Sequence, residues 1–210
     1  LRGLEGAEAC FATASGMAAV FAAMACQLKA GDRVVASRVL FGSCHVIVND
    51  ILPRFGIETE FVDGADPKAW EQALARPASL VFLETPANPT LEIVDLELVT
   101  RLAHGAGAKV IVDNVFATPL LQRPLEFGAD IVVYSATKHI DGQGRCLGGA
   151  ILGAAEFVND TLQPFLRHTG PSLSPFNAWV FLKGLETLPL RLDRHCANAR
   201  ELAGFLAEQP

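Results

Sequence analysis

The chain has 210 residues, a formal net charge of −6, half of its residues hydrophobic and 19% charged. This composition excludes a disordered or fibrous chain and predicts a well-buried globular protein. The acidic balance, without a basic stripe, argues against nucleic acid as a partner.

The cysteines indicate the compartment. They are odd in number and widely spaced, without a C-x-x-C pair, which disfavours a disulfide framework or a zinc site and favours a reducing, cytoplasmic location. We expect each thiol to behave as a small buried hydrophobe. They are Cys10, Cys26, Cys44, Cys146 and Cys196.

The first long segment, residues 9–28, has no charged side chain. It is rich in alanine and interrupted by Thr13, Ser15 and Gly16, which predicts a buried helix rather than a membrane span or signal peptide. Ser15 and Gly16 precede its most apolar part. The N–H groups at a helix start can bind phosphate, although Ser15 as an ordinary N-cap explains the same residues.

Short apolar β-branched runs then alternate with helical segments. Because these runs are continuously apolar, they predict strands covered on both faces, and hence an α/β fold with a three-layer, mainly parallel sheet and helices on both faces. The expected strands are 33–37, 58–63, 79–84, 109–113, 131–136 and 148–152. The expected helices are 16–28, 43–53, 66–75, 95–106 and 121–127.

The last segment, residues 175–210, is predicted to be mostly helical. We expect a boundary near Pro189 that separates a large domain, residues 1–188, from the start of a second domain, residues 189–210. Both ends of the chain resemble cut ends.

Polar side chains follow three of the expected strands. Glu84 ends one strand, with Asn88 shortly after it, Asp113 ends another, and Thr137 and Lys138 follow a third. Ligands of α/β sheets bind at the carboxyl ends of the strands, so we expect these side chains to share a site. Polar residues at strand ends are also ordinary, but three such ends together favour the functional interpretation.

An amine, an acid and a phosphate cradle match the needs of one cofactor. Pyridoxal 5'-phosphate (PLP) requires a lysine for its Schiff base and an acid at its ring nitrogen, and benefits from an aromatic ring such as that of Phe41. Ser135 and Thr137 are predicted to project from the same side of an extended chain towards the phosphate.

Five motifs resemble the Cys/Met-metabolism family of PLP-dependent enzymes over essentially the whole chain. The loop after the lysine is most similar to the O-succinylhomoserine sulfhydrylase branch. The motifs are SGM (15–17), ETPANPTL (84–91), DNVFATP (113–119), SATKHIDGQGRCLGG (135–149) and LSPFNAWVFLKGLETL (173–188).

The resemblance implies fold type I of PLP enzymes, an aspartate-aminotransferase-like large domain, and a role for each matching residue. Lys138 would be catalytic and bind the cofactor covalently, Asp113 would pair with the ring nitrogen, and Asn88 would lie beside the ring oxygen and the substrate carboxylate. Glu84 would support the site, and Phe41 would stack on the ring. The phosphate would be held by Ser15, Gly16, Met17, Ser135 and Thr137.

The resemblance also implies an activity and an assembly. The expected reaction is γ-replacement in methionine biosynthesis, in which O-succinylhomoserine and sulfide give homocysteine and succinate. The family forms homodimers or homotetramers with shared active sites. Its N-terminal arm and most of its C-terminal domain have no counterpart in these residues.

Several alternatives stay open. Arg145 could bind the succinyl carboxylate or form a salt bridge with Asp141. Cystathionine γ-synthase or methionine γ-lyase activity would fit the same family, and a truncated domain could bind partners without catalysis. A nucleotide-binding domain is disfavoured, because GQGRCLG does not match G-x-G-x-x-G and precedes a strand. The histidines lack metal-ligand spacing, so we expect no metal.

Overall fold

The computed structural model describes residues 1–209 and contains a seven-stranded sheet with the strand order β1-β7-β6-β5-β4-β2-β3. Five strands, β3, β2, β4, β5 and β6, run parallel, while β7 is antiparallel to both of its neighbours. The predicted mainly parallel α/β sheet is therefore confirmed. The strands are β1 (Ala9–Thr13), β2 (Arg33–Ser37), β3 (Glu58–Val62), β4 (Leu80–Glu84), β5 (Lys109–Asp113), β6 (Ile131–Ser135) and β7 (Gly149–Gly153).

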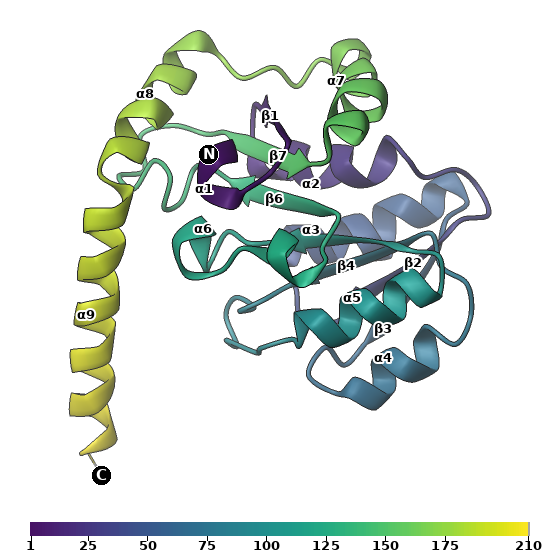
Figure 1. Cartoon of the computed structure of the whole chain (residues 1–210), viewed down its shortest axis with the longest axis horizontal. Helices are drawn as coiled ribbons and strands as arrows, with labels where there is room; N and C mark the ends of the chain where they lie inside the picture. Colours follow the sequence, from purple (N-terminus) through teal and green to yellow (C-terminus); the bar gives the residue numbers. More distant parts are fainter. Residues whose placement is uncertain (210) are drawn as a thin grey trace.

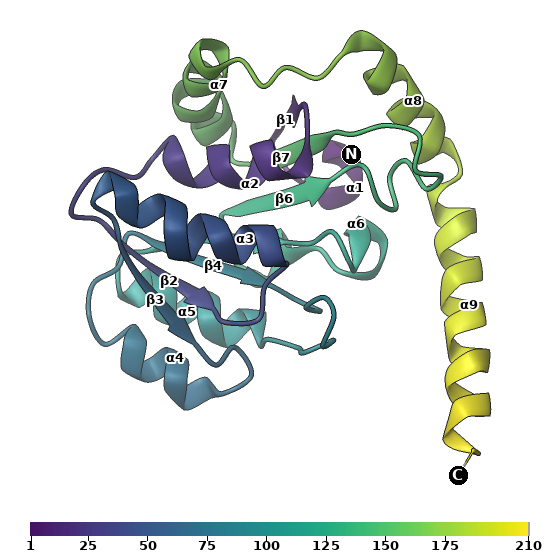
Figure 2. The same cartoon turned by 180° about the vertical axis from the view of Figure 1, so that it is seen from behind.

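Helices cover both faces of the sheet. In Figure 1, α4 and α5 lie in front of the strands, and the reverse view in Figure 2 shows α2 and α3 in front. The α-helices are α1 (Arg2–Glu5), α2 (Gly16–Ala25), α3 (Gly42–Val46), α4 (Pro67–Ala73), α5 (Leu96–Gly105), α6 (Thr118–Leu121), α7 (Gln163–Thr169), α8 (Pro175–Glu186) and α9 (Leu188–Ala207). Short π or 3₁₀ segments are Ile47–Ile51, Leu52–Phe55, Pro124–Phe127 and Phe157–Leu162.

The core has two main layers because successive side chains of a strand project to opposite faces. In β4, Leu80 and Phe82 pack in the cluster under α2 and α3, while Val81 and Leu83 pack in the cluster under α4 and α5. All four side chains are fully buried. Burial of each contributes about 1.5–3 kcal/mol, which explains why these strands appear as continuous apolar runs in the sequence.

The prediction of a helix over residues 9–28 is wrong for its first part. Residues 9–13 form β1, an edge strand paired antiparallel with β7. Its residues Cys10 and Ala12 are exposed, whereas Thr13 is buried, as expected for a strand covered on one face. The expectation that every thiol is buried is therefore wrong for Cys10, and among the five cysteines only Cys44 is fully buried. The helix begins only at Gly16, because the extended backbone of Ser15 ends the strand segment and caps α2.

Other segments differ in detail. The expected α-helix at 121–127 is wrong: α6 already ends at Leu121, and a 3₁₀ turn that begins at a proline covers Pro124–Phe127. Helix α7 and the π segment before it were not anticipated, and neither was α1. Within residues 1–209, no helix has both the length and the apolar character needed to cross a membrane.

The C-terminal region is helical, as predicted. Helix α9 begins at Leu188 and leaves the body of the molecule as a long, isolated rod (Figure 1). The division of the chain at residue 188 stays a prediction, and position 210 of the expected second segment lies outside the described residues.

Candidate active site

Strand direction brings the candidate residues to one edge of the sheet. Four adjacent parallel strands end there with Ser37, Glu84, Asp113 and Ser135. Strand β1 ends at the same edge, because Thr13 and Ser135 are both register partners of Gly149 on β7. The chain after β1 therefore begins α2 beside the end of β6.

A cavity of about 360 Å³ opens at this edge. All nine residues predicted to bind the cofactor line it, together with Glu84. Its lining consists of Ser15, Gly16, Met17, Val20, Phe41, Ser43, Cys44, Glu84, Asn88, Asp113, Val115, Ser135, Thr137, Lys138 and Leu147.

The start of α2 forms one wall. Ser15 accepts a hydrogen bond from the Ala18 N–H at 3.1 Å, so the N-cap interpretation is correct for its hydroxyl. The N–H groups of Gly16 and Met17 have no partner among residues 1–209, and no acidic side chain lies in the first turn. This wall of the cavity therefore favours an anion.

Two glycines allow the start of α2 to approach the ends of β6 and β7 closely. A Cβ on Gly16 would lie 2.5 Å from the Ser135 Cβ, and one on Gly149 would lie 2.3 Å from the Ser15 carbonyl oxygen. Larger residues would separate α2 from β6 and β7. The close approach thus depends on β1, which the sequence did not reveal.

The chain turns directly after β6. The prediction of an extended run through Thr137 is wrong, because the strand ends at Ser135 and a turn begins at Ala136. Both hydroxyl-bearing residues nevertheless line the cavity. The Thr137 hydroxyl lies within 3.3–3.4 Å of the Gly148 backbone, so it is oriented by the strand that follows the loop.

Glu84 binds the backbones of two loops that line the cavity. Its carboxylate accepts hydrogen bonds from the backbone N–H of Phe41 at 2.8 Å and of Asn88 at 3.1 Å. Burial raises the pKa of Glu84, while these two hydrogen bonds oppose the shift. Phe41 itself is 42% exposed.

Asp113 lies on the neighbouring strand, in register with Glu84. Burial raises the pKa of Asp113 to about 7, and the negative charge of Glu84 contributes to the same shift. A hydrogen bond from the Val115 N–H at 3.0 Å acts in the opposite direction and lowers the pKa. Asp113 forms no ion pair within the described part of the chain. Such a carboxyl group is suited to a cationic partner.

Lys138 is an exposed residue in the turn after β6 and lines the same cavity. Its ammonium group has no hydrogen bond or ion pair to any of residues 1–209. Its backbone is held by the turn, in which its carbonyl oxygen accepts a hydrogen bond from the Gly142 N–H at 2.7 Å. The amine of Lys138 is therefore available for covalent chemistry, while the backbone of this residue is held in place by the turn.

Arg145 does not line the cavity. It forms the salt bridge with Asp141 that the sequence left open, with Nε 2.8 Å from Oδ1, and its own N–H donates to Oδ2 at 2.7 Å. The structure therefore supports the alternative role of Arg145 within its loop. A contact between Arg145 and substrate stays an untested prediction.

The adjacent residues Cys44 and His45 have side chains in different places. Cys44 lines the cavity, and burial raises the pKa of its thiol, whereas His45 stacks on Phe61 at 4.5 Å. Sequence reasoning did not include five lining residues in the site: Val20, Ser43, Cys44, Val115 and Leu147. Only Val115 had a local signal, its position two residues after Asp113. No cluster of three or more possible metal ligands occurs within residues 1–209.

Comparisons with known proteins agree with these observations. The model of the family described as Cys/Met metabolism PLP-dependent enzyme matches residues 1–210. An O-succinylhomoserine sulfhydrylase of Mycobacterium tuberculosis is 60% identical over all of this chain and 52% of its own length. An L-methionine gamma-lyase of Treponema denticola is 41% identical over 99% of this chain and 52% of its own length. The chain thus spans about half the length of the curated relatives it matches.

Two solved structures share the fold. The structure of metB from Corynebacterium glutamicum has a TM-score of 0.96 and 37% identity, and this chain matches 54% of it over its own full length. A candidate O-acetylhomoserine (thiol)-lyase, metY, from Campylobacter jejuni has a TM-score of 0.94 and 31% identity, with 60% of that chain covered by all of this one. That structure contains N'-pyridoxyl-lysine-5'-monophosphate. The predicted family and fold type are confirmed: the chain belongs to the family of Cys/Met metabolism PLP-dependent enzymes.

Proposed function

We propose that Lys138 binds PLP covalently in the cavity at the carboxyl edge of the sheet. The main support is that Lys138, Asp113 and the start of α2 meet at one cavity of about 360 Å³. When bound, PLP supplies an electron-accepting ring that stabilises negative charge at the α-carbon of an amino acid.

The residues present fit this cofactor. A protonated ring nitrogen would supply the cation that buried Asp113 lacks and would favour its charged form. The free N–H groups of Gly16 and Met17 would hold the phosphate, together with the hydroxyls of Ser135 and Thr137. The hydroxyl of Ser15 already caps α2, so Ser15 would act chiefly by shaping the cradle.

The remaining residues would orient the ring and the substrate. Phe41 would stack on the ring, and Asn88 would lie beside the ring oxygen and the substrate carboxylate. Glu84 would position both residues through its two hydrogen bonds to their backbones. Lys138, displaced by the substrate amine, would remove the proton from the α-carbon and return protons later in turnover.

We infer that the whole protein catalyses γ-replacement, in which O-succinylhomoserine and sulfide give homocysteine and succinate. The 60% identity to an O-succinylhomoserine sulfhydrylase supports this choice. The relative named L-methionine gamma-lyase favours elimination as the second candidate. In replacement, sulfide adds to the γ-carbon after succinate leaves, whereas in elimination no acceptor adds and hydrolysis by water gives 2-oxobutyrate and ammonia. Addition of cysteine would indicate cystathionine γ-synthase activity.

We also propose a homodimer or homotetramer with shared active sites, on the basis of family membership. A cytoplasmic location is proposed from the odd number and wide spacing of the cysteines. Sedimentation of the protein tests the first proposal, and cell fractionation tests the second.

The decisive experiment measures products with each acceptor. The protein is incubated with O-succinylhomoserine or O-acetylhomoserine and with sulfide, cysteine or water, and the products are quantified. We expect homocysteine from the succinyl ester and sulfide at the highest rate. Formation of 2-oxobutyrate and ammonia at a higher rate than homocysteine would favour the lyase.

Replacement of Lys138 by alanine tests the site itself. We expect Lys138→Ala to abolish turnover and the visible absorbance of lysine-bound PLP, because no other amine lines the cavity. Lys68→Ala, at an exposed position on α4, is the matched control and should retain both. Turnover by Lys138→Ala at the wild-type rate would reject the assignment.

A further inference from the structure

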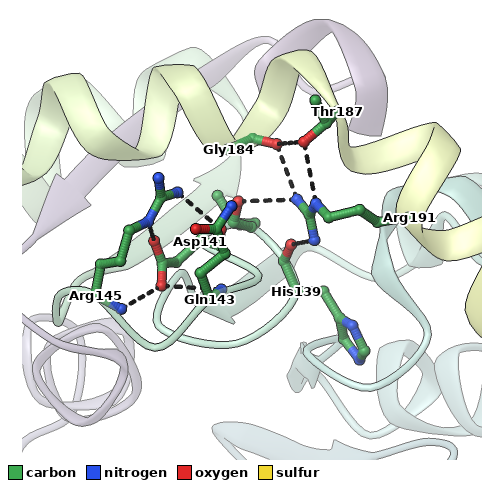
Figure 3. A network of polar contacts seen from close by, with 8 residues as sticks. His139, Asp141, Gln143, Arg145, Gly184, Thr187 and Arg191 are labelled. Atoms are coloured by element: carbon green, nitrogen blue, oxygen red, sulfur yellow. Dashed lines mark hydrogen bonds and ion pairs between the residues drawn. The ribbon is translucent and has the colours of Figure 1, made fainter.

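The side chain of Arg191, near the start of α9, contacts the loop that follows Lys138 (Figure 3). Its Nη1 donates to the His139 carbonyl oxygen at 2.8 Å, and its Nη2 lies 3.4 Å from the Ile140 carbonyl oxygen. The guanidinium group of one helix thus binds the backbone of the two residues directly after Lys138.

The same guanidinium group is fixed from its own side. Nη2 also donates to the Gly184 carbonyl oxygen at the end of α8 at 2.8 Å, and Nε donates to the Thr187 hydroxyl at 3.1 Å. Because guanidinium is planar and its donors are rigidly arranged, these contacts hold the α8–α9 junction and the loop in one relative position.

Two glycines leave the space that this arrangement needs. A Cβ on Gly142, whose φ is +72°, would lie 2.0 Å from Arg191 Nη1. A Cβ on Gly184 would lie 2.1 Å from the Ile140 carbonyl oxygen. Glycine inside a helix costs about 0.5–1 kcal/mol relative to alanine, so close packing of α8 on the loop is the physical reason for Gly184.

The loop is held internally by Asp141. This fully buried carboxylate accepts hydrogen bonds from Arg145 N–H at 2.7 Å, Arg145 Nε at 2.8 Å and Gln143 N–H at 3.3 Å. Although burial opposes the shift, these contacts hold the pKa of Asp141 below its ordinary value. The turn after Lys138 is therefore held together by its own hydrogen bonds, and Arg191 connects it to helices α8 and α9.

The contact between Arg191 and the Lys138 loop lies in the first turns of α9, before this helix extends away from the rest of the protein. Leu188 and Leu192 are the buried residues of this helix, and the side chains beyond position 192 are exposed or partly exposed. The ring of His195 still reaches the ring of His139, with centroids 5.9 Å apart. Arg191 is thus the polar link between the first turns of α9 and the Lys138 loop.

We propose that Arg191 is a positioning residue for Lys138: it sets the place of the loop backbone from which the reactive amine projects. The expected effect of Arg191 on turnover rests on the proposed function, whereas its expected effect on the loop backbone does not. Consecutive Cα atoms are about 3.8 Å apart, so a displacement of the His139 carbonyl displaces Lys138 as well. If Arg191 only joined α8 to α9, its loss would lower stability without a local effect on the loop.

The test compares Arg191→Met and Arg191→Lys with wild type, and with Arg194→Met as the matched control on the same helix. Arg194 is exposed and forms no hydrogen bond or ion pair within residues 1–209. Hydrogen exchange of the peptide covering residues 138–145 is measured by mass spectrometry, with and without added PLP. The amides of Asp141 and Gly142 are hydrogen-bonded within this turn and report on its opening.

We expect exchange in this peptide to be at least about 10-fold faster in Arg191→Met, since hydrogen bonds to a charged group are lost. Arg191→Lys keeps the positive charge but lacks the planar set of several N–H donors, so we expect an intermediate increase in the exchange rate. Arg194→Met should match wild type. With PLP bound, kcat should fall in both Arg191 variants while KM changes little.

Unchanged exchange in residues 138–145 of both Arg191 variants, with only a lower melting temperature, would overturn the proposal. Equal acceleration over the whole sheet would do the same, since it indicates global destabilisation. If Arg191→Met does not fold, exchange in Arg191→Lys decides whether Arg191 positions the Lys138 loop or only joins α8 to α9. If wild type shows no γ-replacement but the loop exchange still depends on Arg191, the proposed function fails and the positioning role stands.

Discussion

At the scale of single residues, the site combines a buried acid with a free amine. Asp113 is 7% exposed and lies without a cation in the described chain, whereas Lys138 is exposed at the same cavity. A buried carboxyl group costs free energy unless a partner compensates it. The acid at this position is therefore better explained by a ligand than by the stability of the protein alone.

Asp113→Asn should consequently stabilise the PLP-free protein above neutral pH. The folded protein keeps a proton on Asp113 up to about pH 7, while the unfolded chain releases it near pH 3.8. Between these values the folded state binds more protons, so the free energy of unfolding falls as pH rises. Asn removes this loss, which is on the order of a few kcal/mol.

Urea denaturation of PLP-free protein at pH 5 and pH 8 measures this effect. Wild type should lose more stability between the two pH values than Asp113→Asn. Some pH dependence should remain in the variant, because burial also raises the pKa of Glu5 to about 7. PLP should bind Asp113→Asn more weakly; unchanged PLP affinity would contradict the pairing with the ring nitrogen.

Arg145→Gln tests the residue whose role the sequence left open. Because its guanidinium group binds the fully buried Asp141, we expect similar loss of activity with succinyl and acetyl esters, and destabilisation of about 1–3 kcal/mol. Rates with both esters and a denaturation curve measure these effects. A loss confined to the succinyl ester would instead support substrate binding by Arg145.

At the scale of elements, the site depends on how closely α2 approaches β6. The start of α2 forms the cavity wall with the free N–H groups of Gly16 and Met17, and Gly16 packs directly on Ser135. Neither element alone creates the cavity. Its shape comes from the contact between a helix start and a strand end, which lie more than a hundred residues apart in the chain.

Gly16→Ala should disrupt that contact. The new methyl group would meet Ser135 at 2.5 Å, which we expect to cost about 1–3 kcal/mol and to weaken PLP binding. Gly204→Ala on α9 is the matched control, since its methyl group meets nothing within 4 Å and removes a helical glycine. Melting temperatures and PLP titrations should separate the two variants; equal behaviour would argue against a tight α2–β6 contact.

At the scale of the whole molecule, a polar network links the N-terminal segment to the sheet beneath the site. The Tyr134 hydroxyl donates to the buried Glu5 carboxyl group of α1 and accepts from Asn114 Nδ2 at 2.6 Å. Asn114 directly follows Asp113 and also bonds to Gln122, whose Nε2 donates to the Thr85 carbonyl oxygen at 2.7 Å. The network therefore connects α1, β6 and two loops near the cavity.

Tyr134→Phe should destabilise the protein by about 1–3 kcal/mol, because Glu5 would then be buried without its donor. One Glu5 oxygen, Oε1, already lacks a hydrogen-bond partner in the described residues. The free energy of unfolding is measured for Tyr134→Phe, Glu5→Gln and the double variant. Additive effects would show that the two groups do not interact; we expect the double variant to lose less than the sum.

The sequence by itself determined the family, the parallel core strands and ten of the residues that line the cavity, the nine cofactor candidates and Glu84. Apolar runs such as 79–84 and 109–113 predict buried strands because both of their faces need burial. Lys138, Asp113 and Glu84 could be selected because polar groups at parallel strand ends meet at one edge. These signals are local in the sequence or follow from strand direction alone.

Only the tertiary structure decided which neighbours these residues have. Strand β1 was missed because its edge pairing with β7, about 140 positions away, leaves no periodic apolar signal. The salt bridge of Arg145 with Asp141 and the contact of Arg191 with the Lys138 loop likewise depend on which groups folding brings within hydrogen-bonding distance. Composition and spacing do not encode such distances, because they arise from packing between elements remote in the chain.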